Sequence, residues 1–133
     1  MNADIPAPWL TDYRAAREAI NCGNIGDGIR ILSALITLYP SKVLFYWVLG
    51  YALLDSGSPK EAVRRFKEAV ILDPTCYPAW GGLGHAYEEL EKWDLAEKAY
   101  RTSVALHVVG VLSRTARARR TLARMASGRA FQR

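Results

Sequence analysis

The sequence predicts an all-α fold, an α-solenoid of three antiparallel helix pairs followed by a C-terminal capping helix. The main observation is a residue pattern that recurs with an offset of 34 positions in the middle of the chain. Within each copy the apolar residues are spaced i, i+3, i+4 and i+7, which places them on one face of a helix. Gly and Pro residues separate the helical segments. The matched pairs are Tyr46/Trp80, Leu49/Leu83, Gly50/Gly84, Leu53/Tyr87, Ala62/Ala96, Phe66/Tyr100 and Ala69/Ser103.

These residues form an aromatic-x2-Leu-Gly-x2-aromatic run followed by Ala-x3-aromatic and then Pro, which resembles the signature of the tetratricopeptide repeat (TPR) family. The full copies are residues 43–76, which end near Pro74, and residues 77–110. Residues 9–42 are in register as a first, degenerate copy, with Ala16 for the Gly, Gly28 for the Ala and Pro40 for the Pro. The resemblance implies that each repeat is a helix pair whose first helix lines a concave surface.

The N-terminal part begins with residues 1–8, an expected extended lead-in because Pro6 and Pro8 disfavour helix. From Trp9 to Cys22 the apolar spacing is helical, and Gly23 supplies the turn. A second helix should end at Tyr39, before Pro40.

The second repeat should contain helices over Lys42–Asp55 and Pro59–Leu72. Gly57 is expected to end the first of them, and Ser58 with Glu61 to form a capping box at the start of the second. The third repeat follows the same plan.

Gly110 is expected to mark the junction with a separate seventh helix over 111–126, and residues 127–133 are expected to fray. Such a helix would cover the apolar face of the last repeat. Its apolar side would carry Leu112, Thr115, Ala118, Leu122 and Met125 or Ala126.

The net charge of +5 is unevenly distributed. Residues 1–110 carry 11 Lys+Arg and 13 Asp+Glu, whereas residues 111–133 carry 7 Arg and no acidic residue. Helical spacing places four arginines on one side of the last helix, opposite its apolar side. This basic patch could hold an acidic protein, nucleic acid or an anionic membrane, or could be the solvated face of a capping helix. It comprises Arg114, Arg117, Arg120 and Arg124.

Several functional classes are not expected. We expect no enzyme, because His85 and His107 lie in different helices and the cluster Glu88, Glu89 and Glu91 is interpreted as a solvated helix end. Two cysteines without CxxC spacing indicate reduced thiols, so neither a metal nor a cofactor is expected. Without a signal-like or membrane-spanning segment in the sequence, the expected location is cytoplasmic.

The expected binding surface is the concave groove, because the segment from Val43 to Leu54 has no charged residue and therefore leaves apolar side chains there. Trp47 and Tyr51 are the expected anchors. Alternatively, these two only pack against neighbouring helices, are covered by residues 5–9, or mediate self-association. The predicted peptide-binding residues are Tyr13, Arg17, Leu44, Trp47, Tyr51, Leu54 and His85.

The function implied by the resemblance is that of an adaptor or chaperone that holds a protein or peptide in this groove. The family's clamp for the C-terminal carboxylate of heat-shock chaperones is not matched, since only Arg17 among its positions could hold a carboxylate. Size, repeat number and groove character resemble small bacterial type III secretion chaperones. The alternative is a scaffold tethered through its basic C-terminal helix to nucleic acid, an anionic membrane or an acidic partner.

Overall fold

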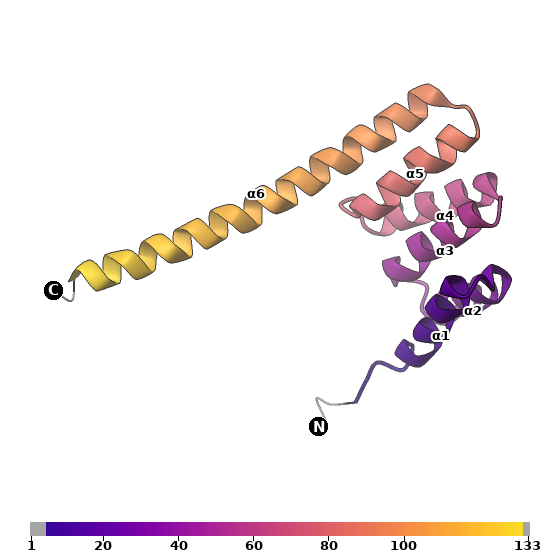
Figure 1. Ribbon diagram of the computed structural model, residues 1–133, viewed down its shortest axis with the longest axis horizontal. Helices are drawn as coiled ribbons and strands as arrows, with labels where there is room; N and C mark the ends of the chain where they lie inside the picture. Colours follow the sequence, from indigo (N-terminus) through magenta and orange to yellow (C-terminus); the bar gives the residue numbers. More distant parts are fainter. Residues whose placement is uncertain (1–4, 132–133) are drawn as a thin grey trace.

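The computed structural model describes residues 5–131, and the side chains in that range except those of residues 113, 118, 121–122 and 125–131. Within residues 5–131 the chain forms six α-helices and no strand, which confirms the predicted all-α solenoid (Figure 1). Consecutive helices pack as the pairs α1–α2, α3–α4 and α5–α6. The helices are α1 (Leu10–Asn21), α2 (Ile25–Leu38), α3 (Val43–Asp55), α4 (Pro59–Leu72), α5 (Tyr77–Glu89) and α6 (Trp93–Phe131).

The close approach of neighbouring repeats depends on an aromatic ring packed against glycines. Phe66 of α4 is fully buried, and a Cβ built on Gly50 would lie 2.6 Å from its ring. A Cβ on Gly82 of α5 would also overlap this ring, so only glycine leaves room for it on either side. In the third repeat Tyr100 lies against Gly84 in the same way, also at 2.6 Å from a built Cβ.

The turn that ends the first helix of each pair recurs with the 34-residue period of the sequence. Gly23, Gly57 and Glu91 occupy equivalent positions with φ of 89°, 81° and 59°. In the middle repeat the amide of Gly57 donates to the carbonyl of Leu54, and that of Ser58 to the carbonyl of Leu53, so the last helical carbonyls are satisfied. Glu91 adopts a left-handed conformation that costs least for glycine.

The aromatic residue that begins the signature in each full repeat, Tyr46 or Trp80, ties its helix to the preceding loop. The Tyr46 hydroxyl donates to the carbonyl of Pro40 at 2.6 Å, and Nε1 of Trp80 donates to the carbonyl of Pro74 at 2.9 Å. In both full repeats this position thus holds an aromatic ring that carries a hydrogen-bond donor, whereas the degenerate first repeat has Asp12 there.

The predicted capping box at the start of α4 is wrong. Ser58 is the N-cap residue but makes no side-chain capping hydrogen bond. Glu61 instead pairs with Arg64 at 3.6 Å. The predicted roles of Gly57 and of Pro59, the first residue of the helix, agree with the structure.

The predicted separate capping helix over 111–126 and the frayed tail from residue 127 are wrong. Helix α6 continues without a break from Trp93 to Phe131, with Gly110 inside it, and extends away from the stacked helices (Figure 1). Leu112, expected to cover the third repeat, is 62% exposed, and Thr115 is exposed as well. The side chains expected beside them at 118, 122, 125 and 126 lie outside the described set, as do residues 1–4 of the lead-in and residues 132–133 of the tail.

In the described part of the chain, no helix combines the length and apolar character needed to cross a membrane.

Candidate functional site: the concave groove

The candidate site lies along the first helices of the three pairs, α1, α3 and α5, on the surface expected from the repeat pattern to be concave. We call this surface the concave groove. Helices α3 and α5 contact each other directly. Between Val43 and Leu54, α3 has no charged residue, so each of its sides presents apolar groups. One side is buried through Phe45, Tyr46, Val48 and Leu49. Four large side chains of α3 remain half-buried, namely Leu44, Trp47, Tyr51 and Leu54. Of these, Tyr51 and Leu54 line a pocket.

Trp47 and Tyr51 contact each other edge to face, with ring centroids 6.2 Å apart. The Tyr51 hydroxyl donates to the carbonyl of Pro78 at 2.9 Å, and its ring packs on that of Phe66 with centroids 5.0 Å apart. Burial raises the pKa of Tyr51. Tyr51 thus joins α3 to α5, whereas Trp47 makes neither of these contacts. A substitution of Trp47 should therefore test ligand binding with less effect on the packing of α3 against α5.

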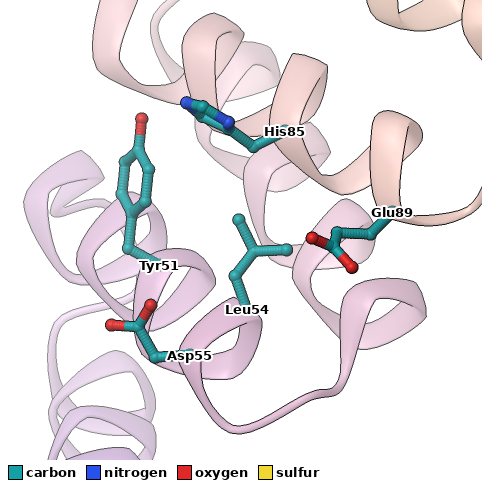
Figure 2. Close-up of a pocket in the computed structure, with 5 residues that line it drawn as sticks. All are labelled: Tyr51, Leu54, Asp55, His85 and Glu89. Atoms are coloured by element: carbon teal, nitrogen blue, oxygen red, sulfur yellow. The ribbon is translucent and has the colours of Figure 1, made fainter.

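A pocket of about 280 Å³ lies between α3 and α5 (Figure 2). We call it the α3–α5 pocket. Tyr51 and Leu54 supply its apolar wall, while Asp55, His85 and Glu89 are exposed around it. Small-molecule sites usually enclose roughly 300–1,000 Å³. A space below that range suits one side chain of a bound segment better than a whole cofactor.

Tyr100 of α6 contacts two polar side chains of α5, one of which, His85, lines the α3–α5 pocket. Its hydroxyl donates to Oε2 of Glu88 at 3.0 Å and lies 3.0 Å from Nδ1 of His85. Burial and the neighbouring Glu88 raise the pKa of Tyr100 to about 12, so the hydroxyl keeps its proton at neutral pH. These contacts hold His85 and Glu88 in place at the rim of the groove.

The predicted peptide-binding residues are only partly brought together. Tyr51, Leu54 and His85 share the α3–α5 pocket, and Trp47 adjoins it through Tyr51. Tyr13 instead packs against Phe45 with ring centroids 5.9 Å apart, and Arg17 is exposed on α1. Leu44 lies half-buried near the start of α3.

The lead-in does not show the contacts that would cover the aromatic pair. Ile5 is 69% exposed, and Trp9 packs against Tyr13 and Phe45 rather than against Trp47. Nζ of Lys42 lies 4.4 Å from the centroid of the Trp9 ring.

The predicted peptide-binding residues include neither Tyr100 nor Asp55, Glu88 and Glu89, although the repeat register places these three acidic residues on the concave surface. We call Asp55, Glu88 and Glu89 the acidic rim. Asp55, Glu88 and Glu89 follow the apolar stretches of α3 and α5, where they read as ordinary exposed helix ends. One signal was available at position 100, where a tyrosine replaces the Phe66 of the preceding repeat. Its added hydroxyl is the group that contacts Glu88 and His85.

Away from the groove, the predicted basic patch lies on the part of α6 beyond the array. Arg114, Arg117, Arg120 and Arg124 are all exposed. Among the described residues no group of His, Cys, Asp and Glu is arranged to hold a metal ion. Cys22 is exposed and Cys76 buried, both as free thiols, and burial raises the pKa of Cys76.

Comparison with known proteins places this geometry among repeat proteins. Sequence profiles described as tetratricopeptide repeat match residues 13–75 and 53–107. Anaphase-promoting complex subunit 6 of Arabidopsis thaliana is 32% identical over 88 residues, which cover 66% of this chain and 16% of that protein. The human cell division cycle protein 16 homolog is 34% identical over 73 residues, or 54% of this chain and 12% of that protein. The chain thus spans less than a fifth of the length of these curated relatives.

Solved structures show the same fold. The second TPR of Spaghetti (RPAP3), bound to the HSP90 peptide SRMEEVD, superposes with a TM-score of 0.71 at 19% identity, covering 74% of this chain and 91% of that one. The Sgt2 TPR domain from Aspergillus fumigatus gives a TM-score of 0.73 at 18% identity, covering 80% and 72%. At these identities the likeness concerns the fold.

Proposed function

Because the chain belongs to the tetratricopeptide repeat family, we propose that it is a protein-interaction adaptor that holds a segment of a partner protein in its concave groove. The observation that carries this proposal is the half-buried apolar side of α3, with Trp47 at its centre. Water contact with such a surface is unfavourable, and exposed apolar patches usually mark partner sites. Large aromatic side chains at the centre of an interface contribute most of its binding energy.

The charge of the rim narrows the chemistry of the partner segment. The carboxylates of Asp55 and Glu89 line the α3–α5 pocket, and Glu88 is exposed next to Glu89 on α5. This negative charge favours a Lys or Arg side chain there. The aliphatic stem of such a side chain would lie against Tyr51 and Leu54 while its charged end reaches the carboxylates. We therefore propose a segment that combines apolar anchors with a basic residue.

The same rim disfavours an acidic chain terminus of the kind bound by the RPAP3 domain, whose peptide SRMEEVD carries several carboxylates. Two positions of the family's carboxylate clamp are occupied here by Val48 and Gly82, and both are buried. Neither can reach a ligand in the groove.

A finer version of the proposal follows from the likeness in size, repeat number and groove character to type III secretion chaperones. In that version the protein acts in the cytoplasm, and its occupant is an extended apolar segment of a secreted protein. Shielding that segment in the groove would prevent its aggregation. The acidic rim predicts that the protected segment carries a basic residue beside its apolar anchors.

The proposal is tested by affinity capture from native cell extract with the full chain as bait, followed by mass spectrometry. The variant Asp55→Lys/Glu89→Lys should no longer capture the protein that the wild-type chain captures in greatest amount, because the partner's basic residue would meet like charge in the groove. The matched control is Glu61→Lys/Glu97→Lys, which makes the same charge change on exposed residues of the second helices α4 and α6. Equal capture by the groove variant and the control would contradict a groove site.

A further inference from the structure

From residue 104 onward, α6 carries an apolar seam with no partner in the described structure. Val104 and Val108 are 62% and 46% exposed, and Val111 is 40% exposed. Together with the exposed Thr115 they follow the alternating spacing of four and three residues that marks one side of a helix in coiled-coil contacts. We call these four residues the α6 seam. In the sequence the same spacing continues at positions 118, 122 and 125 with Ala, Leu and Met.

Basic residues border this seam. At 3.6 residues per turn, Arg114 and Arg119 lie beside it, whereas Arg120 and Arg124 lie on the opposite face of α6. All four are exposed. Residues 111–133 contain seven arginines and no acidic residue, so two such helices paired seam to seam would bring like charges together. The surface that receives the seam should therefore be apolar and acidic.

The concave groove has this character. At the α3–α5 pocket, Tyr51 and Leu54 supply apolar surface, and Asp55 and Glu89 supply carboxylates. Trp47 contacts Tyr51 on α3, and the exposed Glu88 precedes Glu89 on α5. Residues 1–110 carry a net charge of −2, from 11 basic and 13 acidic residues. The chain thus presents two exposed surfaces that complement each other in both polarity and charge.

The two surfaces cannot meet within one molecule in this structure. Helix α6 runs unbroken and leads away from the array, so its seam does not turn back toward the groove (Figure 1). Its length suits an intermolecular contact. Residues 104–125 span about 33 Å at 1.5 Å per residue, and three inner helices packed at about 8–10 Å spacing present a groove roughly 20 Å wide.

We propose that the α6 seam of one copy docks in the concave groove of a second copy, with Arg114 and Arg119 facing the acidic rim. The inference rests on the proposed function in one respect, namely that the groove accepts a helix or peptide. Self-association then shields both apolar surfaces until a partner segment with higher affinity displaces α6. Assembly and partner binding compete for the same groove.

The test measures the mass of the purified full chain by light scattering over a concentration series. The wild-type protein should exceed the monomer mass at high concentration and dissociate on dilution. Arg114→Glu/Arg119→Glu should weaken association at least tenfold, while Arg120→Glu/Arg124→Glu, with the same change in net charge, should change it less than threefold. Circular dichroism would establish that all variants remain helical.

A charge swap gives the second part of the test. The variant Asp55→Lys/Glu89→Lys alone should associate as weakly with itself as Arg114→Glu/Arg119→Glu alone does. Mixing the two variants should restore association, because each variant supplies a surface that matches a surface of the other in charge. A strictly monomeric wild type, equal loss from both arginine pairs, or no restoration on mixing would overturn the inference.

Failure of this self-docking inference can be told apart from failure of the proposed adaptor function. A wild type that stays monomeric yet captures a partner through the groove would overturn the α6 contact alone. Restored association on mixing, with no groove-dependent partner in cell extract, would support the α6 contact and contradict the adaptor. Binding of the monomer to anionic lipid vesicles or DNA through Arg114 and Arg119 would assign the seam to those partners and contradict self-docking.

Discussion

At the scale of single residues, the fold depends on contacts in which no side chain other than glycine fits. A Cβ on Gly50 would lie 2.6 Å from the Phe66 ring, whereas one on Gly26 would have nothing within 4 Å. Both glycines lie in helices, at positions without positive φ. Alanine at Gly26 should therefore show only the gain in helix propensity, whereas alanine at Gly50 should show that gain together with the cost of crowding.

Gly50→Ala should destabilise the protein by about 1–3 kcal/mol, because the added methyl group displaces a fully buried ring. Gly26→Ala should leave stability unchanged or raise it by up to about 1 kcal/mol. Urea unfolding followed by circular dichroism measures both. Equal effects of the two substitutions would mean that Gly50 is not a contact position between helices.

Glu91 offers a second residue-scale prediction. It has φ of 59° at the position where the other two repeats have Gly23 and Gly57. Glu91→Gly should relieve this strain and stabilise the protein by about 0.5–1 kcal/mol, and Gly57→Ala should destabilise it by about 1–2 kcal/mol. Thermal melting of the two variants checks the opposite signs. A lower melting temperature for Glu91→Gly would show that the Glu91 side chain makes a compensating contact.

At the scale of elements, the sequence predicts best where the physical cause is local. The boundaries of α4 agree with the prediction because Pro59 starts the helix and Asp73-Pro74 follows its end. The capping box failed because side-chain hydrogen bonding depends on rotamers that spacing does not determine. The break expected near Gly110 failed because a glycine inside a helix costs only about 1 kcal/mol, which the Ala, Leu and Arg residues elsewhere in α6 can offset.

The corrected course of α6 leads to a prediction of its own. Removing residues 116–133 should lower the helical signal yet change the unfolding free energy of the repeats by less than about 0.5 kcal/mol, because exposed side chains contribute little. The melt should be recorded at low protein concentration, where self-association does not add to stability. A loss of several kcal/mol would show that this part of α6 packs on the array after all.

At the scale of the whole molecule, the aromatic side of the groove could be predicted from α3 alone, since a helix without charges must leave apolar groups facing outward. The repeat register also places Asp55, Glu88 and Glu89 on the concave side. The α3–α5 pocket and the position of Tyr100 could not be predicted, because both depend on the distances between packed helices. The contact of Tyr100 with Glu88 and His85 joins residues that are 12 and 15 positions apart. Such contacts follow from how helices are stacked rather than from the repeat pattern.

In the proposed complex a partner segment is held through Trp47 in the concave groove. Calorimetric titration of the captured partner against Trp47→Ala tests it most directly, with Lys67→Ala on the exposed side of α4 as the control. The account predicts that Trp47→Ala weakens binding by about thirtyfold, near 2 kcal/mol, whereas Lys67→Ala binds as the wild type does. Normal binding by a folded Trp47→Ala variant together with loss of binding by Lys67→Ala would place the site on the outer helices and contradict the account.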